Sequence, residues 1–303
     1  MVRFFYIYKK NLIFILKQFI RAALWLFCSD INVKNKHLLK NKNPLLIIAN
    51  HPNSFLDAII IGAQYKRPLN FLARGDAFTK KHHRFLLGLL KMIPIYRLRE
   101  GKQYLHLNEY AFTESVRLIK KGESVLIFIE GNCTNSHTLH PFKKGTARIV
   151  EKLKEQNIYH QIHIVGIAYN QFMGIGKKVN LSISEFSFPT PLKSGKEKME
   201  FNKAVFDTLT LNIFPPIQQT KINKTPLYYF HYLYYQLIRK ITAQKTKGTV
   251  FYDSVLFSLL LFTYPLFLVL IFFILYIFSI PMTIIFGILL CIPILSKFTI
   301  DTI

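Results

Sequence analysis

One apolar segment constrains this chain more than any other feature of its sequence. From Val255 to Leu295, 41 residues follow one another without a charged side chain. As an α-helix this segment would be about 60 Å long, roughly twice the thickness of the hydrocarbon core of a bilayer. A helix buried in a protein core is the alternative, but the length argues against it. We therefore expect a C-terminal transmembrane helical hairpin that turns near residues 279–281.

Basic residues flank the predicted hairpin at both ends. Arg239, Lys240, Lys245 and Lys247 precede it, and Lys297 follows it. Because segments rich in Lys and Arg stay on the cytoplasmic side of a membrane, both ends are expected there. Aromatic residues crowd positions 228–235, just before the hairpin, as they do at headgroup depth. The sequence thus predicts a protein of the inner (cytoplasmic) membrane whose domain before the hairpin lies on the cytoplasmic side.

The first 29 residues contain basic side chains but no acidic one. At about 100° per residue, the basic residues Arg3, Lys10, Lys17 and Arg21 fall within roughly 40° of one another on a helix surface that is otherwise mostly apolar. This pattern is typical of an amphipathic helix lying in a membrane interface. A helix packed on the domain has the same pattern, while charges inside the apolar core argue against a signal peptide.

The chain carries a large positive charge. Its 40 Lys and Arg residues outnumber 16 Asp and Glu residues, for a net charge of +24. Such an excess favours an anionic partner, which is nucleic acid, an anionic membrane or a phosphorylated substrate. Because interleaved basic and aromatic strand motifs are missing, no nucleic acid is expected. Three scattered cysteines are an odd set, which favours a reducing compartment over a disulfide framework.

Strand and helix signals alternate between residues 30 and 235. After a polar linker at 30–43, apolar runs predict strands at 45–49, 70–73, 93–96, 125–129, 162–168 and 179–188, and helices at 54–61, 76–90, 102–121 and 147–153. This order is typical of an α/β domain with a mostly parallel sheet flanked by helices. We expect three parts, namely an interface helix at 1–29, the α/β domain at 30–235, and a basic linker with the membrane hairpin at 236–303.

Asn50, His51 and Pro52 follow directly on the first of these strands. Pro52 disfavours a helical conformation at His51, so the histidine is expected on the turn that leaves the strand. Asp57 follows six residues later. A carboxylate that orients an imidazole frees the other ring nitrogen to take a proton from a bound hydroxyl. Ser54-x-x-Asp57 is also a capping box, in which the carboxylate only closes the first turn of a helix.

Asn50-His51 with Asp57 resembles the first motif of the glycerolipid acyltransferases, which acylate glycerol-3-phosphate and lysophosphatidate. That family usually places four residues between the histidine and the aspartate, whereas this chain has five. On a straight helix an offset of six residues turns the two side chains to different faces. The turn at Pro52 and Asn53 is therefore expected to absorb the extra residue.

Met92 to Arg97 resembles the second motif of the same family. There an arginine ends an apolar strand, where it can hold a phosphate through two parallel hydrogen bonds. Phe128 to Gly131 resembles the third motif, although Ile129 replaces the usual proline. Cys133 stands where that motif often has a basic residue, so this position supplies no positive charge for a phosphate.

Two further segments resemble the family less closely. Lys143, within the family-like run Phe142 to Gly145, could supply the missing basic charge. Ile164 to Ile167 resembles a degenerate fourth motif in which Gly166 replaces a proline. The resemblance therefore covers about residues 45–169, with its landmarks in the expected order.

The resemblance implies a membrane-attached O-acyltransferase of phospholipid biosynthesis. It would move a fatty acyl group from acyl-CoA or acyl carrier protein to a hydroxyl of lysophosphatidate, a lysophospholipid, or glycerol-3-phosphate. His51 would be the base and Asp57 its partner. The implied substrate-binding residues are Asn50, Arg97, Glu130, Gly131 and Lys143, and backbone amides near Gly131 would stabilise the oxyanion. The resemblance implies no cofactor and no metal.

Several alternatives stay open at the level of the residues. The acceptor could be another lysolipid or an aminolipid, and a non-catalytic membrane lipid-binding protein would have the same charge and apolar tail. Cys133 beside His51 would be the nucleophile of a thiol enzyme. The residues Cys133, His137, His140, His160 and His163 have metal-like spacings, although such pairs arise by chance among ten histidines.

Overall fold

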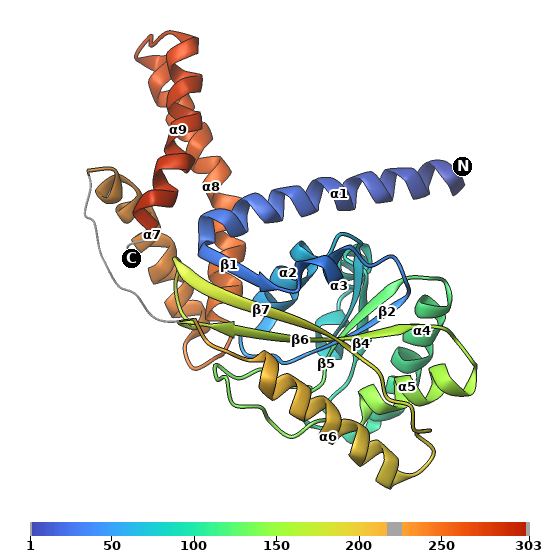
Figure 1. Ribbon diagram of the computed structural model, residues 1–303. Helices are drawn as coiled ribbons and strands as arrows, with labels where there is room; N and C mark the ends of the chain where they lie inside the picture. Colours follow the sequence, from blue (N-terminus) through green and yellow to red (C-terminus); the bar gives the residue numbers. More distant parts are fainter. Residues whose placement is uncertain (1, 217–225, 301–303) are drawn as a thin grey trace.

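The computed structural model of the chain describes residues 2–216 and 226–300. The side chains of residues 2–11 and 226–231 lie outside the described part, and with them Arg3 and Lys10 of the predicted basic stripe and much of the aromatic run. A seven-stranded sheet forms the centre of the molecule, with helices on both faces (Figure 1). The predicted α/β architecture with a mostly parallel sheet is confirmed.

The strand order in the sheet is β1-β7-β6-β2-β5-β3-β4, and every neighbouring pair is parallel except β6 with β7. The strands are β1 (Cys28–Lys34), β2 (Leu45–Ala49), β3 (Leu69–Arg74), β4 (Met92–Ile95), β5 (Ser124–Phe128), β6 (Gln161–Tyr169) and β7 (Lys177–Phe186). β2 lies between β5 and β6, and all five of its residues are buried. A strand covered on both faces is a continuous apolar run in sequence, which is why β2 could be predicted.

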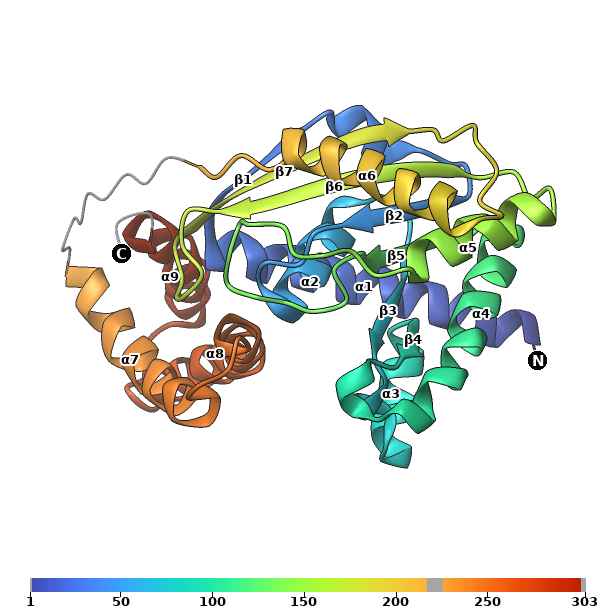
Figure 2. The same cartoon turned by 90° about the horizontal axis from the view of Figure 1, so that it is seen from below.

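The helices form two layers on the sheet (Figure 1, Figure 2). One face carries α1 (Val2–Phe27), α2 (Ser54–Gln64) and the start of α8 (Tyr252–Ile277), and the other carries α4 (Asn108–Lys120), α5 (Gly145–Glu155) and α6 (Gly195–Asn212). The remaining helices are α3 (Lys81–Leu89), α7 (Pro226–Thr246) and α9 (Met282–Ile300). Leu45 and Ile47 of β2 pack on the first layer, and Leu46 and Ile48 pack on the second, because side chains alternate along a strand.

The segment predicted as a polar linker, residues 30–43, contains regular structure. β1 pairs with β7 at the edge of the sheet, and a 3-10 helix, η1 (Lys36–Lys40), follows it. The prediction was wrong because an edge strand needs few apolar residues, and β1 exposes Asp30, Asn32 and Lys34 while burying Val33.

The helix predicted over residues 102–121 begins later than expected. A 3-10 helix, η4 (Lys102–Leu107), precedes α4. The Asn108 carboxamide accepts a hydrogen bond from the Tyr96 amide at 2.7 Å and donates to the Tyr96 carbonyl at 2.8 Å. These two bonds tie the start of α4 to the segment just after β4, where Arg97 lies.

The apolar C-terminal segment forms two helices, α8 and α9, which pack on each other and project away from the sheet (Figure 1). The chain turns at Ser279, whose φ is +55°, shortly before Pro281. Among the described residues, α8 alone is long and apolar enough to cross a membrane, since the apolar part of α9, Met282–Leu295, is shorter. The membrane hairpin therefore stays a prediction.

The described basic residues of α1 point toward the protein. Arg21 donates from Nε to the carbonyl of Ala63 at 2.8 Å, and the Lys17 ammonium donates to the carbonyl of Tyr65. These carbonyls end α2, where the helix dipole attracts cations. Phe14 and Ile15, in contrast, are each 63% exposed. The amphipathic helix thus docks its basic side on α2 and presents apolar side chains outward.

Candidate active site

The residues of the predicted site follow neighbouring strands at one edge of the sheet. His51 comes after β2 and Glu130 after β5, Arg74 ends β3, and Arg97 comes after β4. Because these four strands are adjacent and parallel, their carboxyl ends meet at the same edge. Binding sites of open α/β sheets form at this edge. In the strand order, β3, which ends at Arg74, lies one position nearer to β2 than β4, which precedes Arg97.

His51 and Asp57 are in direct contact. Nδ1 of His51 lies 2.8 Å from Oδ2 of Asp57, which also accepts the backbone N–H of Asn53 at 2.8 Å. The histidine side chain is 18% exposed and the carboxylate is fully buried. The carboxylate thus accepts the N–H of the N-cap residue and orients the imidazole. The capping box predicted at Ser54 does not form, because the N-cap of α2 is Asn53 and its side chain makes no cap.

The turn between these two residues absorbs the extra position in the motif. Asn53 has an extended φ of −138°, and Ser54 adopts a left-handed conformation with φ +52° before α2 continues. This change of direction keeps His51 off the helix, where the six-residue offset would point the two side chains apart. A left-handed conformation at a residue other than glycine is uncommon and occurs where function or packing requires it.

Tyr169, at the end of β6, is a site residue that the sequence did not reveal. Its phenol donates to Oδ1 of Asp57 at 2.5 Å, across 112 positions of sequence. Burial, together with the neighbouring Asp57 carboxylate, raises the pKa of Tyr169 well above its usual value. The phenol therefore stays protonated and donates permanently. No local sequence signal could have connected the two residues.

Phe128, the last residue of β5, stacks on the His51 ring. The ring centroids are 3.8 Å apart and the planes are inclined by only 7°. Together with the bond to Asp57, this stacking restricts rotation of the imidazole about its side-chain bonds. Its orientation is thus fixed from one edge and one face, which is the preorganisation that proton transfer requires.

Asn50 and Glu130 hold backbone at the site. Asn50, 2% exposed, donates to the Ile167 carbonyl at 2.9 Å and accepts the Ile167 N–H at 2.8 Å. Glu130, 5% exposed, accepts the N–H of His51 at 2.9 Å and that of His140 at 3.0 Å. The structure shows them fixing Ile167 near the end of β6 and the backbone of His51 and His140, and their role in substrate binding stays a prediction.

Gly131 and Lys143 lie against each other in the loop after β5. Gly131 has φ +66°, and a Cβ at this position would lie 2.9 Å from Cγ of Lys143. The Gly131 N–H donates to the Phe128 carbonyl at 3.1 Å, so this amide is not free for an oxyanion. Lys143 is exposed, which leaves its ammonium available for an anionic ligand.

The two arginines at the site edge are paired with carboxylates. Nε of Arg97 lies 2.5 Å from Oε1 of Glu100, and Arg74 makes two hydrogen bonds to Asp76. The Arg74 guanidinium lowers the pKa of the Asp76 carboxyl below its usual value. These ion pairs hold the guanidinium groups in place. A phosphate bound there would accept hydrogen bonds from guanidinium N–H groups that do not bind the carboxylates.

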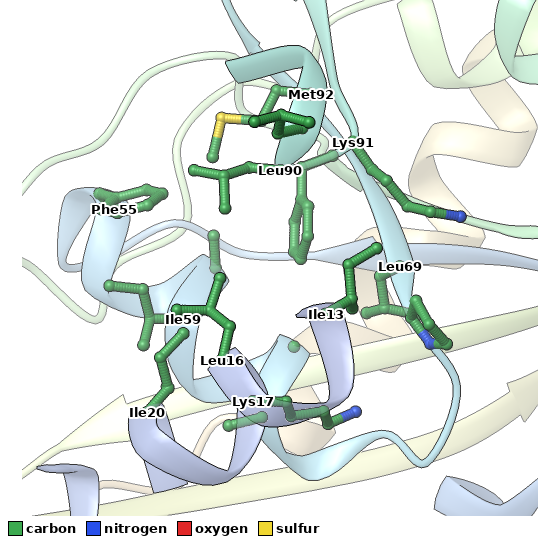
Figure 3. A pocket seen from close by; sticks show the side chains of 16 residues that line it. Ile13, Leu16, Lys17, Ile20, Phe55, Ile59, Leu69, Leu90, Lys91 and Met92 are labelled. Atoms are coloured by element: carbon green, nitrogen blue, oxygen red, sulfur yellow. The ribbon is translucent and has the colours of Figure 1, made fainter. Parts of the chain in front are cut away.

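An apolar pocket lies between α1, α2 and the start of β4. Figure 3 shows Leu16 and Ile20 of α1 opposite Phe55 and Ile59 of α2, with Leu90 among the side chains that close the far side. These α2 residues lie on the same helix as Asp57. Phe55 also borders a second apolar groove, whose other lining residues come from α8 and the residue before it. Two apolar surfaces therefore begin at the helix that carries the dyad.

The histidines with metal-like spacings have other contacts. His137 accepts the N–H of Tyr169 at 3.0 Å, His140 contacts the Thr134 hydroxyl at 2.7 Å, and His163 contacts the Tyr65 hydroxyl at 3.0 Å. Within the described residues, no three His, Cys, Asp or Glu side chains gather as metal ligands. These rings instead support the loops and the core around the site.

Residues 30–170 match a protein family described as Acyltransferase. Over 120 residues, 39% of its length, this chain is 28% identical to 1-acyl-sn-glycerol-3-phosphate acyltransferase BAT2, chloroplastic, from Brassica napus. The match spans about a third of that relative, 32% of its length.

The fold is similar to a solved structure, the 1-acyl-sn-glycerophosphate (LPA) acyltransferase PlsC from Thermotoga maritima. The TM-score is 0.50 at 19% sequence identity, and the match covers 68% of this chain and 80% of the other. At this identity the likeness concerns the arrangement of the sheet and helices.

Proposed function

We propose that this chain, which belongs to the glycerolipid acyltransferase family, transfers a fatty acyl group to a hydroxyl of a phosphorylated glycerol acceptor. The acceptor is lysophosphatidate or glycerol-3-phosphate, and the donor is the thioester of acyl-CoA or acyl carrier protein. The observation that carries the proposal is the 2.8 Å contact between Nδ1 of His51 and the buried carboxylate of Asp57, at the carboxyl end of the central strand.

The reaction uses the dyad as a base and then as an acid. Asp57 holds the Nδ1–H of His51, so Nε2 takes the proton from the acceptor hydroxyl. The alkoxide oxygen attacks the thioester carbonyl and forms a tetrahedral oxyanion. When this intermediate collapses, the carbon–sulfur bond breaks and the thiolate takes the proton from the imidazolium. An ester and a free thiol result, and His51 is neutral again.

The basic residues at the sheet edge bind the acceptor phosphate in this proposal. Arg97 offers a planar guanidinium and Lys143 an exposed ammonium. Arg74 ends β3, which lies between β5 and β4, the strand that precedes Arg97. A guanidinium can hold two phosphate oxygens at once, which a lysine cannot. Asn50 and Glu130 serve the same site by fixing the backbone around His51.

The apolar surfaces suit the lipid parts of the substrates. The pocket between α1 and α2 is lined almost wholly by aliphatic and aromatic side chains, which favour a fatty acyl chain over a polar ligand. The outward apolar side of α1 and the helices α8 and α9 attach the protein to the inner membrane, with the α/β domain on the cytoplasmic side. This attachment brings the site to the level where lysolipids lie.

The base is tested with the purified full-length chain in lipid vesicles, a radiolabelled acyl-CoA or acyl carrier protein, and lysophosphatidate or glycerol-3-phosphate. His51→Ala should lower kcat by about two to four decades because a positioned base is lost. His37→Ala, at an exposed position of η1, serves as the matched control and should keep wild-type turnover. Wild-type turnover in a folded His51→Ala protein would show that the mechanism is wrong.

The acceptor is tested with Arg97→Lys. Against lysophosphatidate this variant should raise KM at least tenfold, because the bidentate phosphate contact is lost. Against a neutral monoacylglycerol, KM should not change. An equal effect on both acceptors would show that Arg97 does not bind the phosphate. A wild-type preference for a lysolipid without a terminal phosphate, or for an aminolipid, would assign that acceptor instead.

A further inference from the structure

The first turn of α8 is connected to the turn that holds the dyad. Oδ2 of Asp253 accepts a hydrogen bond from the Asn53 carboxamide at 2.7 Å, although 200 positions separate the two residues. The hydroxyl of Ser254 accepts the N–H of Leu56 at 3.3 Å. That N–H belongs to the first turn of α2, whose own cap residue, Asn53, makes no side-chain cap. α8 therefore supplies the partners that the start of α2 does not supply itself.

Asp253 is a buried charge with a buried counter-ion. Its carboxylate and the Lys177 ammonium form an ion pair in which both side chains are 0% exposed. Its other oxygen, Oδ1, accepts the N–H of Gly174 at 2.9 Å. A carboxylate in such a place is stable only when it is paired and hydrogen-bonded. These contacts leave Asp253 little freedom, so it can serve as a fixed anchor.

Asn53 connects Asp253 to the dyad. Its side chain donates to Asp253, and its backbone N–H donates to Oδ2 of Asp57, the same oxygen that holds Nδ1 of His51. The Asn53 carboxamide oxygen has no hydrogen-bond partner among the described atoms. The orientation of Asn53 is therefore set by its donors, of which the bond to Asp253 is the shortest.

We propose that Asp253 is a positioning residue of the dyad, so that the apolar helix α8 completes the active site. The proposal rests on the proposed function above. Asp253 touches neither His51 nor substrate, and it acts through Asn53 on the placement of Asp57. Both Asp253 and Lys177 lie outside residues 30–170, the segment that matches the family. Activity of this chain then depends on the seating of α8 against α2.

Two variants separate positioning from simple stability. Asp253→Asn keeps the shape but leaves the Lys177 charge unpaired, so both the melting temperature and kcat should fall. Asp253→Leu combined with Lys177→Met removes both charges together with both acceptor oxygens, and it should recover the melting temperature relative to Asp253→Asn. Because Asn53 still lacks its carboxylate acceptor, kcat of the double variant should stay at least tenfold below wild type, with KM for lysophosphatidate within twofold. Asp207→Asn, an exposed acid on α6, is the control.

Recovery of kcat to wild type in the double variant would overturn the proposal and leave the pair as structural only. If either variant fails to fold, Asn53→Ala decides, because it removes the donor and leaves both charges paired. It should lower kcat at least tenfold at an unchanged KM, and a wild-type kcat would overturn the proposal. An inactive wild-type chain, or an active His51→Ala chain, would instead refute the proposed function.

Discussion

Tyr169 donates its phenol hydrogen to Oδ1 of Asp57 over 2.5 Å, in a part of the interior where neither side chain is exposed. The carboxylate thus has three donors, which are the His51 ring, the Asn53 amide and this phenol. Three donors from different directions hold a carboxylate in one orientation. The position of the proposed base, His51, therefore depends on a residue 112 positions away from Asp57.

Tyr169→Phe should keep the fold and lower kcat about tenfold, because Oδ1 of Asp57 loses its donor and the carboxylate can rotate. The buried, unpaired oxygen should also cost about 1–3 kcal/mol of unfolding free energy. Steady-state kinetics and thermal melting measure the two effects. Tyr159→Phe, 66% exposed, is the matched control and should change neither. An unchanged kcat for Tyr169→Phe would show that the donor has no part in positioning.

Gly131→Ala should destabilise the loop after β5 for two separable reasons. A Cβ at φ +66° costs about 1–2 kcal/mol, and it would also lie 2.9 Å from Cγ of Lys143. Lys143→Ala in the same chain removes the second reason only. The melting temperature of the double variant should therefore be higher than that of Gly131→Ala and lower than that of Lys143→Ala. If Gly131→Ala and the double variant melt at the same temperature, the Lys143 side chain moves away from the added Cβ at no cost in stability.

Gly166→Ala should be much less stable than wild type. A Cβ there would lie 2.4 Å from the carbonyl oxygen of Asn212, which is backbone at the end of α6. Overpacking against backbone costs about 1–3 kcal/mol. At Gly88 in α3 an added Cβ meets nothing, so Gly88→Ala should raise stability by about 0.5–1 kcal/mol. Urea midpoints measure both, and loss of stability in Gly88→Ala alone would contradict this account.

The stability of the chain should fall on the acid side partly because of His163. Burial lowers the pKa of His163 from 6.5 to about 4, so the unfolded chain binds more protons between these values. Unfolding free energy is then lost as the pH falls through this window, by on the order of 3 kcal/mol in total. His163→Gln should flatten the melting temperature between pH 7 and pH 5, whereas His37→Gln should not. Parallel pH profiles for wild type and His163→Gln would refute this.

Local patterns in the sequence determined most of the elements. β2 is apolar on both faces, α2 follows a proline-containing turn, and Val255 to Leu295 carries no charge, so each could be recognised within its own segment. The order of these elements predicted the parallel sheet, and the resemblance of Asn50-His51 with Asp57 to a family motif predicted the pair. Such predictions work because burial and helical period depend on neighbouring residues.

Only the tertiary structure decided which distant groups meet. It made residues 28–34 an edge strand, turned Lys17 toward the end of α2, and brought Tyr169 and Asp253 to the turn around Asp57. It also showed that Asn50 and Glu130 bind backbone. These contacts depend on hydrogen bonds and ion pairs between residues that packing brings together, and no local periodicity records them.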